Sequence, residues 1–311
     1  MGSRGLAALV TVFCSVLLLA SCVARRRVIT RSKTMPSQAL RVADKAALLG
    51  ALRTEYESIQ SLSLTVDMVP ALGSVNKGKI TEYKDVRAYI LFRKPAEIRI
   101  VGLYPVVRNK AFDMVSNGTD FRIFVPAKNR FIVGRNELAE TPSANKIENL
   151  RPSVFLDALL IKPPDLKDSV VLTDLTDEDN AVYILHLLDS GPDGQLISAR
   201  DIWFSRLTLN AIRQIIFDAG GEILTDARYN DWKTYDGYLF PHVIDINRPQ
   251  DEYGVVITLV KADINKSISD SRFVLERPEG TVLQVLGAKP EPKEGDPAHA
   301  SSASRKKKTA E

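Results

Sequence analysis

Hydrophobic residues recur along the chain at two different periods, and each period predicts a different kind of element. From residue 39 to residue 60 the apolar positions follow helical spacing, which predicts a long amphipathic helix. From Leu62 onward, short runs alternate apolar and polar residues, as is typical of half-buried strands. Turn-forming pairs such as Asn117-Gly118 separate these runs, so the chain is expected to form consecutive hairpins.

The strand pattern continues almost to the end of the chain. The predicted strands lie near residues 62–66, 88–92, 98–101, 112–115, 121–125, 131–133, 170–172, 182–188, 202–204, 212–217, 223–232, 240–247, 255–262 and 273–275. Residues 142–161 interrupt the series with an apolar segment that predicts one or two short helices, one of them starting at Pro152.

Such a series lacks the alternation of strands and helices that parallel sheets require, so it predicts an antiparallel meander. Many consecutive strands must also close or curl, because a long flat sheet leaves exposed edges. We therefore predict an α+β fold that is mainly β. It is a curved antiparallel half-barrel of about 11 or more strands, with the long N-terminal helix and the mid-chain helices covering its concave side.

The N-terminus has the pattern of a secretory signal. Arg4 precedes an apolar run from Leu6 to Ala20, which is too short for a typical membrane span. The run ends in Leu19-Ala20-Ser21-Cys22, which resembles the bacterial lipobox. That resemblance implies a signal peptide over residues 1–21 and a diacylglyceryl group on Cys22, which would attach the protein to a membrane. The alternative is an ordinary signal with a chance cysteine.

Charge and composition divide the rest of the chain. Residues 1–38 carry six basic and no acidic side chains, whereas residues 39–286 carry 30 basic and 34 acidic ones. The slight excess of positive charge therefore belongs to the ends, and we expect no nucleic-acid partner. We assign residues 22–38 to the lipidated cysteine and a basic flexible tether, residues 39–286 to one domain, and residues 287–311 to a disordered tail.

The sequence offers little for catalysis. It lacks a Gly-x-Ser-x-Gly elbow, a phosphate-binding loop and a dinucleotide fingerprint. Two Cys and three His leave no basis for a Cys-rich or His-rich metal site. We expect structural roles for His186 and His242. We therefore predict a protein that is not an enzyme and that needs no metal or cofactor.

Several motifs in a fixed order resemble the lipoprotein-carrier superfamily of LolA and LolB. They are Tyr56-x-x-Ile59-x-Ser61-Leu62, then Arg93-Lys94-Pro95, then the hairpin from Val115 to Pro126, then the mid-chain insert, and finally Ile264-Asn265, Phe273-Val274-Leu275 and Pro278-Glu279-Gly280. A lipid-anchored chain is closer to the LolB type. The resemblance implies that a half-barrel holds acyl chains beneath a helical lid.

The same resemblance suggests site residues. Lys94 stands where LolA has an arginine that latches the lid, beside Arg93, and a lysine does not make the same forked hydrogen bonds. Leu72, or Leu103 with Tyr104, is a candidate for the apolar tip of the protruding loop of LolB. The candidate cavity residues are Ile90, Phe92, Ile98, Ile100, Phe121, Ile123, Phe131, Phe155, Leu159 and Phe217.

The expected function follows from these points. We expect a monomeric, lipid-anchored protein of the bacterial cell envelope, on the outer membrane and facing the periplasm. It would bind or transfer an acylated ligand, either a lipoprotein or a lipid. The alternative is a structural or sensing module of the same fold that binds a protein partner in the periplasm. A large apolar cavity favours the first function, and a packed interior favours the second.

Overall fold

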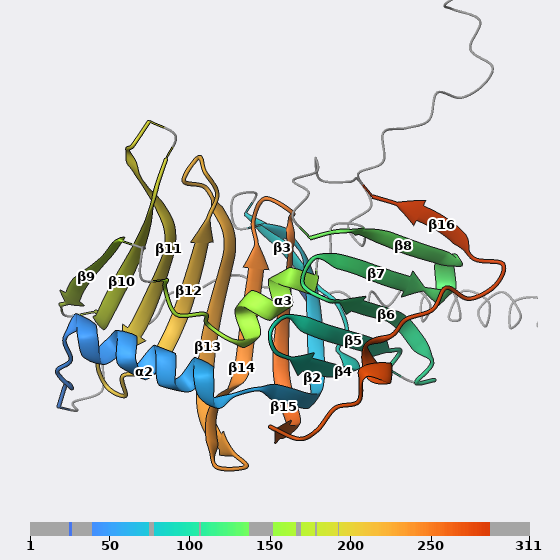
Figure 1. Cartoon of the computed structure of the whole chain (residues 1–311), viewed down its shortest axis with the longest axis horizontal. Helices are drawn as coiled ribbons and strands as arrows, with labels where there is room; N and C mark the ends of the chain where they lie inside the picture. The colour runs from blue at the N-terminus through green and yellow to red at the C-terminus, as the bar shows by residue number, and fades with distance from the viewer. Residues whose placement is uncertain are drawn as a thin grey trace, which may run out of the picture.

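The computed structural model describes residues 25–26, 39–74, 78–105, 107–136, 152–165, 169–177, 179–191 and 193–286. These residues form one 16-stranded sheet with two α-helices and two short 3-10 helices, shown in Figure 1. The prediction of a mainly β, open and curved sheet is confirmed. The predicted signal peptide, Cys22, most of the tether and the predicted tail lie outside the described residues.

The sheet consists of two antiparallel meanders. The first has the strand order β8-β7-β6-β5-β4-β2, and the second has the order β15-β14-β13-β12-β11-β10-β9. The first-meander strands are β2 (Ser61–Ser74), β4 (Val86–Arg93), β5 (Glu97–Leu103), β6 (Lys110–Ser116), β7 (Asp120–Val125) and β8 (Arg130–Arg135). The second-meander strands are β9 (Ser169–Thr176), β10 (Ala181–Ser190), β11 (Leu196–Ser205), β12 (Ala211–Phe217), β13 (Ile223–Tyr235), β14 (Tyr238–Arg248) and β15 (Tyr253–Ile264).

The two meanders join where β2 pairs with β15. This antiparallel pair runs from Leu62 opposite Ile264 to Leu72 opposite Tyr253, with one bulge near Val260. The first and last long strands of the domain therefore lie side by side in the middle of the sheet. Three short strands complete the sheet: β3 (Lys79–Glu82) beside β2, β1 (Arg25–Arg26) beside β3, and β16 (Val282–Val285) at the edge next to β8.

Both helices lie on one face of the sheet, which we call the inner face. Helix α2 (Lys45–Ser58) begins at Asp44, whose side chain accepts a hydrogen bond from the Ala47 amide at 2.7 Å, and it buries Leu48 and Leu52. It is shorter than the helix predicted over 39–60. Helix α3 (Pro152–Leu159) begins at a proline, as predicted. No helix of the described part of the chain is long and apolar enough to cross a membrane.

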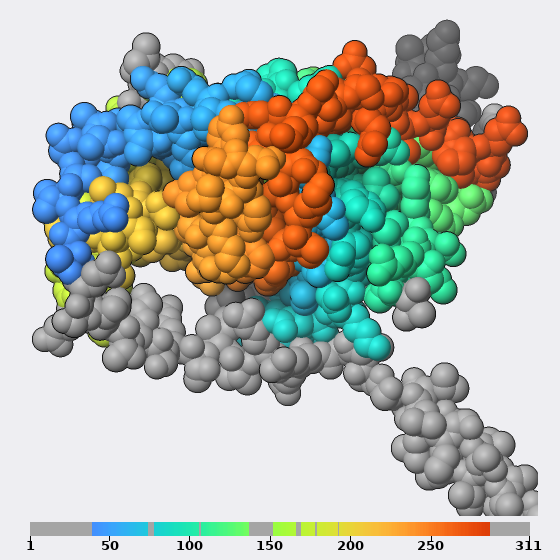
Figure 2. Space-filling model, turned by 90° about the horizontal axis from the view of Figure 1, so that it is seen from below, coloured from blue at the N-terminus to red at the C-terminus, as the bar shows by residue number. Residues whose placement is uncertain are grey.

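The main core fills the space between the inner face and the two helices. It includes side chains from β2, β4 to β8, β10 to β15 and both helices, so it is continuous across the joint between the meanders. A smaller cluster of Val115, Phe131, Phe273 and Leu275 lies on the opposite, outer face. There, residues 265–281 cross the first meander as a C-terminal strap, visible in red in Figure 2.

The strap corrects one predicted element. Residues 273–275 were expected to form a strand, but the strap contains the 3-10 helix η4 (Asp270–Phe273) followed by irregular chain. Arginine side chains of the sheet donate to the strap the hydrogen bonds that a neighbouring strand would otherwise donate. Arg99 Nη1 donates to the carbonyls of Arg272 and Val274, at 2.9 and 3.2 Å, and Arg122 Nη1 donates to the carbonyl of Leu275 at 3.2 Å. These contacts satisfy the strap's carbonyls without a sheet ladder. The other 3-10 helix, η2 (Pro126–Lys128), forms the turn between β7 and β8.

Candidate functional site

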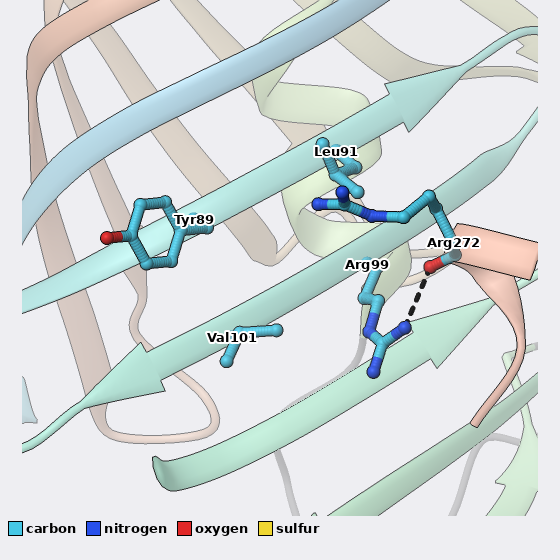
Figure 3. Close-up of a pocket in the computed structure, with 5 residues that line it drawn as sticks. All are labelled: Tyr89, Leu91, Arg99, Val101 and Arg272. Atoms are coloured by element: carbon cyan, nitrogen blue, oxygen red, sulfur yellow. Dashed lines mark hydrogen bonds between the residues drawn. The ribbon is translucent and has the colours of Figure 1, made fainter. Parts of the chain in front are cut away.

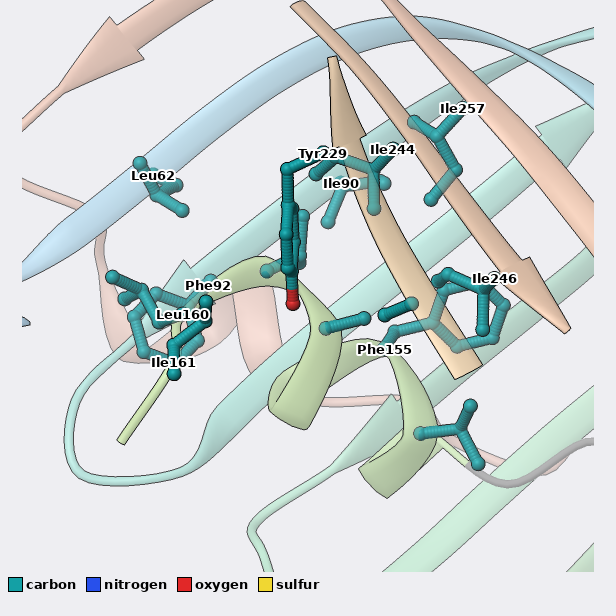
Figure 4. Close-up of a cluster of buried hydrophobic side chains, with 14 of the residues drawn as sticks. Leu62, Ile90, Phe92, Phe155, Leu160, Ile161, Tyr229, Ile244, Ile246 and Ile257 are labelled. Carbon is teal, nitrogen blue, oxygen red and sulfur yellow. The ribbon is translucent and has the colours of Figure 1, made fainter. Parts of the chain in front are cut away.

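The inner face brings together most of the predicted cavity residues. Figure 4 shows this packing around α3, with Ile90, Phe92 and Phe155 among the labelled side chains. Eight of the ten predicted residues lie in the main core, each exposed by 4% or less. They are Ile90, Phe92, Ile98, Ile100, Phe121, Ile123, Phe155 and Leu159. In this conformation the side chains of α3 fill the space against the sheet, so the interior here is packed.

Two predicted cavity residues lie elsewhere. Phe131 is buried in the outer-face cluster beneath the strap, because β8 turns the neighbouring Ile132 toward the inner face. Phe217 is half-buried at the end of β12, where a bulge between Ile216 and Phe217 shifts the register. Successive side chains of a strand point to opposite faces, so a one-residue shift moves a side chain to the other face.

Part of the inner face is polar. Gln214 lies opposite Ile202 and Ala227, two core residues with no exposed surface, and its own exposure is 1%. Its Nε2 donates to the backbone carbonyl of Asp157 in α3 at 2.9 Å, and its Oε1 lies 3.4 Å from Nη1 of Arg200 in β11. The helix α3 is therefore tied to the sheet by a buried amide.

A second polar pair follows on the next strands. Arg248 Nη1 in β14 donates to Thr225 Oγ1 in β13 at 2.9 Å, and Arg248 Nε donates to Asp251 at 2.7 Å. Thr225 is 3% exposed. We call Arg200, Gln214, Thr225 and Arg248, together with Asp157, the inner polar cluster. It lies within the second meander, whereas the first meander contributes mainly apolar side chains to the core.

Three ionisable groups, one each on α2, α3 and β13, have raised pKa values. Burial raises the pKa of Glu55 in α2 to about 7. Burial also raises the pKa of Asp157, although solvent reaches that residue and Arg200 and Arg248 act in the opposite direction. Tyr229 in β13 is 2% exposed, and its pKa is raised mainly by burial and further by the charges of Glu55 and Asp157.

The two candidate latch residues have different partners. Lys94 Nζ donates to the carbonyl of Tyr56 near the end of α2, and it lies 3.9 Å from the centre of the Tyr56 ring. Arg93 instead bonds Glu97 at 2.6 Å and reaches the strap, donating to the carbonyl of Ile268 at 2.9 Å. Lys94 therefore contacts a helix of the inner face, whereas Arg93 holds the strap.

The candidate loop residues lie near one end of the sheet. Leu103 ends β5 opposite Arg87, and Tyr104 follows it with 40% exposure. Leu72 lies in the far part of β2, where it pairs with Tyr253 and with Thr81 of β3. Leu72 is half-buried in the sheet, so of these three residues only Tyr104 is well exposed.

The outer face carries a separate small pocket of about 210 Å³. It is lined by Tyr89, Leu91, Arg99, Val101 and Arg272, as Figure 3 shows. Arg99 is held by Asp113, which has no exposed surface, through two hydrogen bonds of 2.9 Å. This pocket lies under the strap and on the side of the sheet opposite the helices, so it is not part of the helix-covered interior.

Three residues of β9 to β11 have the order of an acid–base relay. Asp201 Oδ1 lies 2.8 Å from His186 Nδ1, and Thr173 Oγ1 lies 3.2 Å from His186 Nε2. They are neighbours across strands on the outer face, and β10 is paired on both sides. Its amides are thus not available for an oxyanion hole, and we interpret the array as a link between strands. This agrees with the structural role expected for His186.

The sequence did not indicate the inner polar cluster. The bulge at Trp203/Phe204 places an extra residue in β12 and shifts the alternation of inward and outward positions between Ala211 and Gln214. The inward direction of Gln214 is therefore set by strand pairing, whereas Arg200 alternates regularly with the buried residues Ile202 and Phe204 of β11. The one available signal was a glutamine within the largely apolar segment Ala211–Phe217.

Comparison with known proteins gives distant likenesses of fold. No protein-family model matches the chain, and no curated protein sequence matches it. Among solved structures, a DUF1329 family protein from Desulfovibrio piger is similar, with 17% identity and a TM-score of 0.49, over 73% of this chain and 94% of that one.

Two further solved structures are similar to the same extent. A proposed outer membrane lipoprotein-sorting protein domain from Vibrio parahaemolyticus has 11% identity and a TM-score of 0.48, over 73% of this chain and 94% of that one. A LolA superfamily protein from Nitrosomonas europaea has 14% identity and a TM-score of 0.45, over 73% of this chain and 97% of that one. The resemblance predicted from the sequence agrees with the names of these two proteins. All three TM-scores lie below 0.5, and none of these proteins identifies a ligand for this chain.

Proposed function

We propose that this chain is a lipid-anchored protein of the bacterial envelope that binds an acylated ligand between its helices and the inner face of its sheet. The supporting observation is the convergence of eight predicted cavity side chains, from the three strands β4, β5 and β7 and from α3, on one face of a single open sheet. Cys22 would carry the anchor, and the protein would face the periplasm from the outer membrane. No step of this function needs a catalytic group.

The packed interior sets a condition on binding. Ligand and α3 compete for the same surface, so an acyl chain must displace the apolar side chains Val154, Phe155, Leu159, Leu160 and Ile161. Exposing five such side chains costs about 8–15 kcal/mol, and burying a chain of about 14 methylenes gains about 11 kcal/mol. The cost of exposing the side chains and the gain from burying the acyl chain are of similar size. Replacement of α3 by the ligand, and the reverse, are therefore both accessible, as delivery of a ligand requires.

A soluble form that starts at Val23 tests this proposal. Gently purified from cells and analysed by native mass spectrometry, it should carry a stoichiometric acyl ligand that solvent extraction identifies. A clean apo mass that does not change when lipids and acylated peptides are offered would contradict ligand binding.

The packed interior also favours a second candidate function. In a structural or sensing module, α3 would stay on the sheet and a protein partner in the periplasm would bind the outside of the molecule. The same native mass spectrometry separates the two functions, because a sensing module remains apo and instead forms a defined complex with a partner captured from the periplasm.

A further inference from the structure

A buried hydroxyl lies at the border between the apolar core and the inner polar cluster. Tyr229 belongs to β13, opposite Ile244 of β14, and it lies in the main core. Figure 4 shows its side chain directed from the strand toward α3. Its hydroxyl oxygen has no hydrogen-bond partner within the described part of the chain. A buried hydroxyl without a partner destabilises the folded protein, and a phenylalanine at this position would avoid that cost.

The groups around Tyr229 determine whether its hydroxyl keeps its proton. Glu55 of α2 and Asp157 of α3 act on it from the helix side, and both oppose its ionisation. Arg200 acts in the opposite direction from the inner polar cluster, and Asp226 adds a negative charge from the outer face of β13. Burial is the largest influence, and it raises the pKa of Tyr229. The hydroxyl therefore keeps its proton and can donate a hydrogen bond.

The inner polar cluster is also rich in donors. Gln214 carries an amide, and Arg200 and Arg248 carry guanidinium groups, on β12, β11 and β14. Gln214 pairs with Ala227, which lies two residues from Tyr229 on β13. A ligand with apolar chains and an acceptor group fits such a surface, since the chains can lie on the apolar first meander. Ester and amide carbonyls are the acceptors that accompany acyl chains in both lipids and lipoproteins.

We propose that the Tyr229 hydroxyl is the polar anchor of the ligand site and donates a hydrogen bond to the ester or amide carbonyl of an acylated ligand, next to the inner polar cluster. This proposal rests on the proposed function, because a residue that is 2% exposed is reached only after α3 has moved. It adds a chemical requirement to that function: the site should distinguish an acyl ester from an alkyl ether of equal length.

Paired probes test the requirement. A diacylglycerol and a dialkylglycerol of the same chain length differ in the carbonyl groups, and each is titrated into the soluble form starting at Val23. Trp232, whose ring centre lies 6.5 Å from that of Tyr229, provides a fluorescence signal close to the site. We expect the ester to bind about three- to tenfold more tightly than the ether, as one net hydrogen bond predicts.

Two variants locate the effect. Tyr229→Phe should bind ester and ether equally, with its affinity for the ether unchanged. Its melting temperature should stay the same or rise, because no partnered hydrogen bond is lost. Tyr183→Phe is the matched control: it removes another core hydroxyl, but one that already accepts a hydrogen bond from the Ala43 amide at 3.5 Å. This control should keep the preference for the ester.

The outcomes separate the proposals. Equal binding of the two probes by the wild-type protein, or an ester preference that survives in Tyr229→Phe, overturns the anchor role and leaves the proposed function standing; a buried water on Tyr229 would give this result. Absence of binding for both probes and for an N-acylated peptide overturns the proposed function and the anchor role together. An N-acylated peptide, titrated in parallel, identifies the source: the acyl compound whose affinity falls most in Tyr229→Phe is the ligand class that the site recognises.

Discussion

Glu55 links the stability of the molecule to pH. Burial raises the pKa of Glu55 in α2 from 4.5 to about 7, so the folded protein retains a proton that the unfolded chain loses first. The contribution of Glu55 to stability is therefore highest below about pH 4.5 and falls as the pH rises to about 7. Glu55→Gln should remove this slope and be about 1–3 kcal/mol more stable than the wild-type protein at pH 8.

Urea denaturation at pH 4.5, 6 and 8 measures this slope. Glu57→Gln, at an exposed position of the same helix, controls for the loss of one negative charge. Parallel pH curves for the wild-type protein and Glu55→Gln would show that Glu55 is well hydrated and that its burial has no energetic effect.

Two Arg–Asp pairs on the outer face differ mainly in burial. Asp113 has no exposed side-chain surface and bonds Arg99 and Lys110, whereas Asp67 is 32% exposed and bonds Arg87. Removing one partner of a buried pair leaves the other charge uncompensated, so Asp113→Asn should cost about 3 kcal/mol. Asp67→Asn should cost less than about 1 kcal/mol, because solvent compensates Arg87.

The free energies of unfolding of these two variants, measured in urea, check the comparison. A small loss for Asp113→Asn would mean that Arg99 and Lys110 turn to solvent when the carboxylate is gone. In that case the contacts of Arg99 with the strap carbonyls should also weaken, and limited proteolysis within residues 265–281 should become faster.

At the scale of elements, α3 is the part that the proposed function requires to move. Phe155 of α3 and Phe131 of β8 are matched: both are buried, at 2% and 3% exposure, but on opposite faces of the sheet. Substitution by leucine should destabilise either site by about 1 kcal/mol. Phe155→Leu should also speed the uptake of a fluorescent acyl probe by about fivefold, because less packing holds α3.

Stopped-flow fluorescence measures the uptake, and Phe131→Leu should leave the rate unchanged. Equal rates for both variants and the wild-type protein would show that α3 is not the barrier to entry. Equal acceleration in both would mean that uptake follows global unfolding rather than the movement of one helix.

The same elements show what a sequence pattern can predict. Thirteen of the predicted strands coincide with observed ones, because each is a short apolar or alternating run bounded by turn signals. Phe273-Val274-Leu275 is also a short apolar run, yet it lies in the strap, where guanidinium groups of the sheet bind the backbone carbonyls. An apolar run indicates that side chains are buried, but it does not indicate which groups bind the backbone.

The short edge strands and the inner polar cluster were not predicted from the sequence, for related reasons. Strand β16 is mostly exposed and pairs in parallel with β8, so its formation depends on the path of the strap rather than on its own four residues. Gln214 faces inward because a bulge between β11 and β12 sets the register of its strand. Such positions are decided by tertiary pairing, which the local sequence does not encode.

At the scale of the whole molecule, the joint between β2 and β15 decides whether the two meanders unfold together. The joint contains eleven register pairs, and the core on its inner face is continuous, with Leu64 of β2 and Ile257 of β15 both buried. Separating the meanders would expose that core, so we expect one cooperative transition for the domain assigned to residues 39–286.

The two tryptophans make this expectation measurable. Trp203 and Trp232 lie in β11 and β13, so their fluorescence reports the second meander alone, whereas far-ultraviolet circular dichroism reports all strands. The two urea curves should coincide in midpoint and slope. Phe124→Trp, a half-buried outer-face position of β7, adds a reporter in the first meander and should give the same midpoint. Separate transitions would show two independent units, and a ligand could then enter by parting the meanders at β2 and β15 rather than by displacing α3.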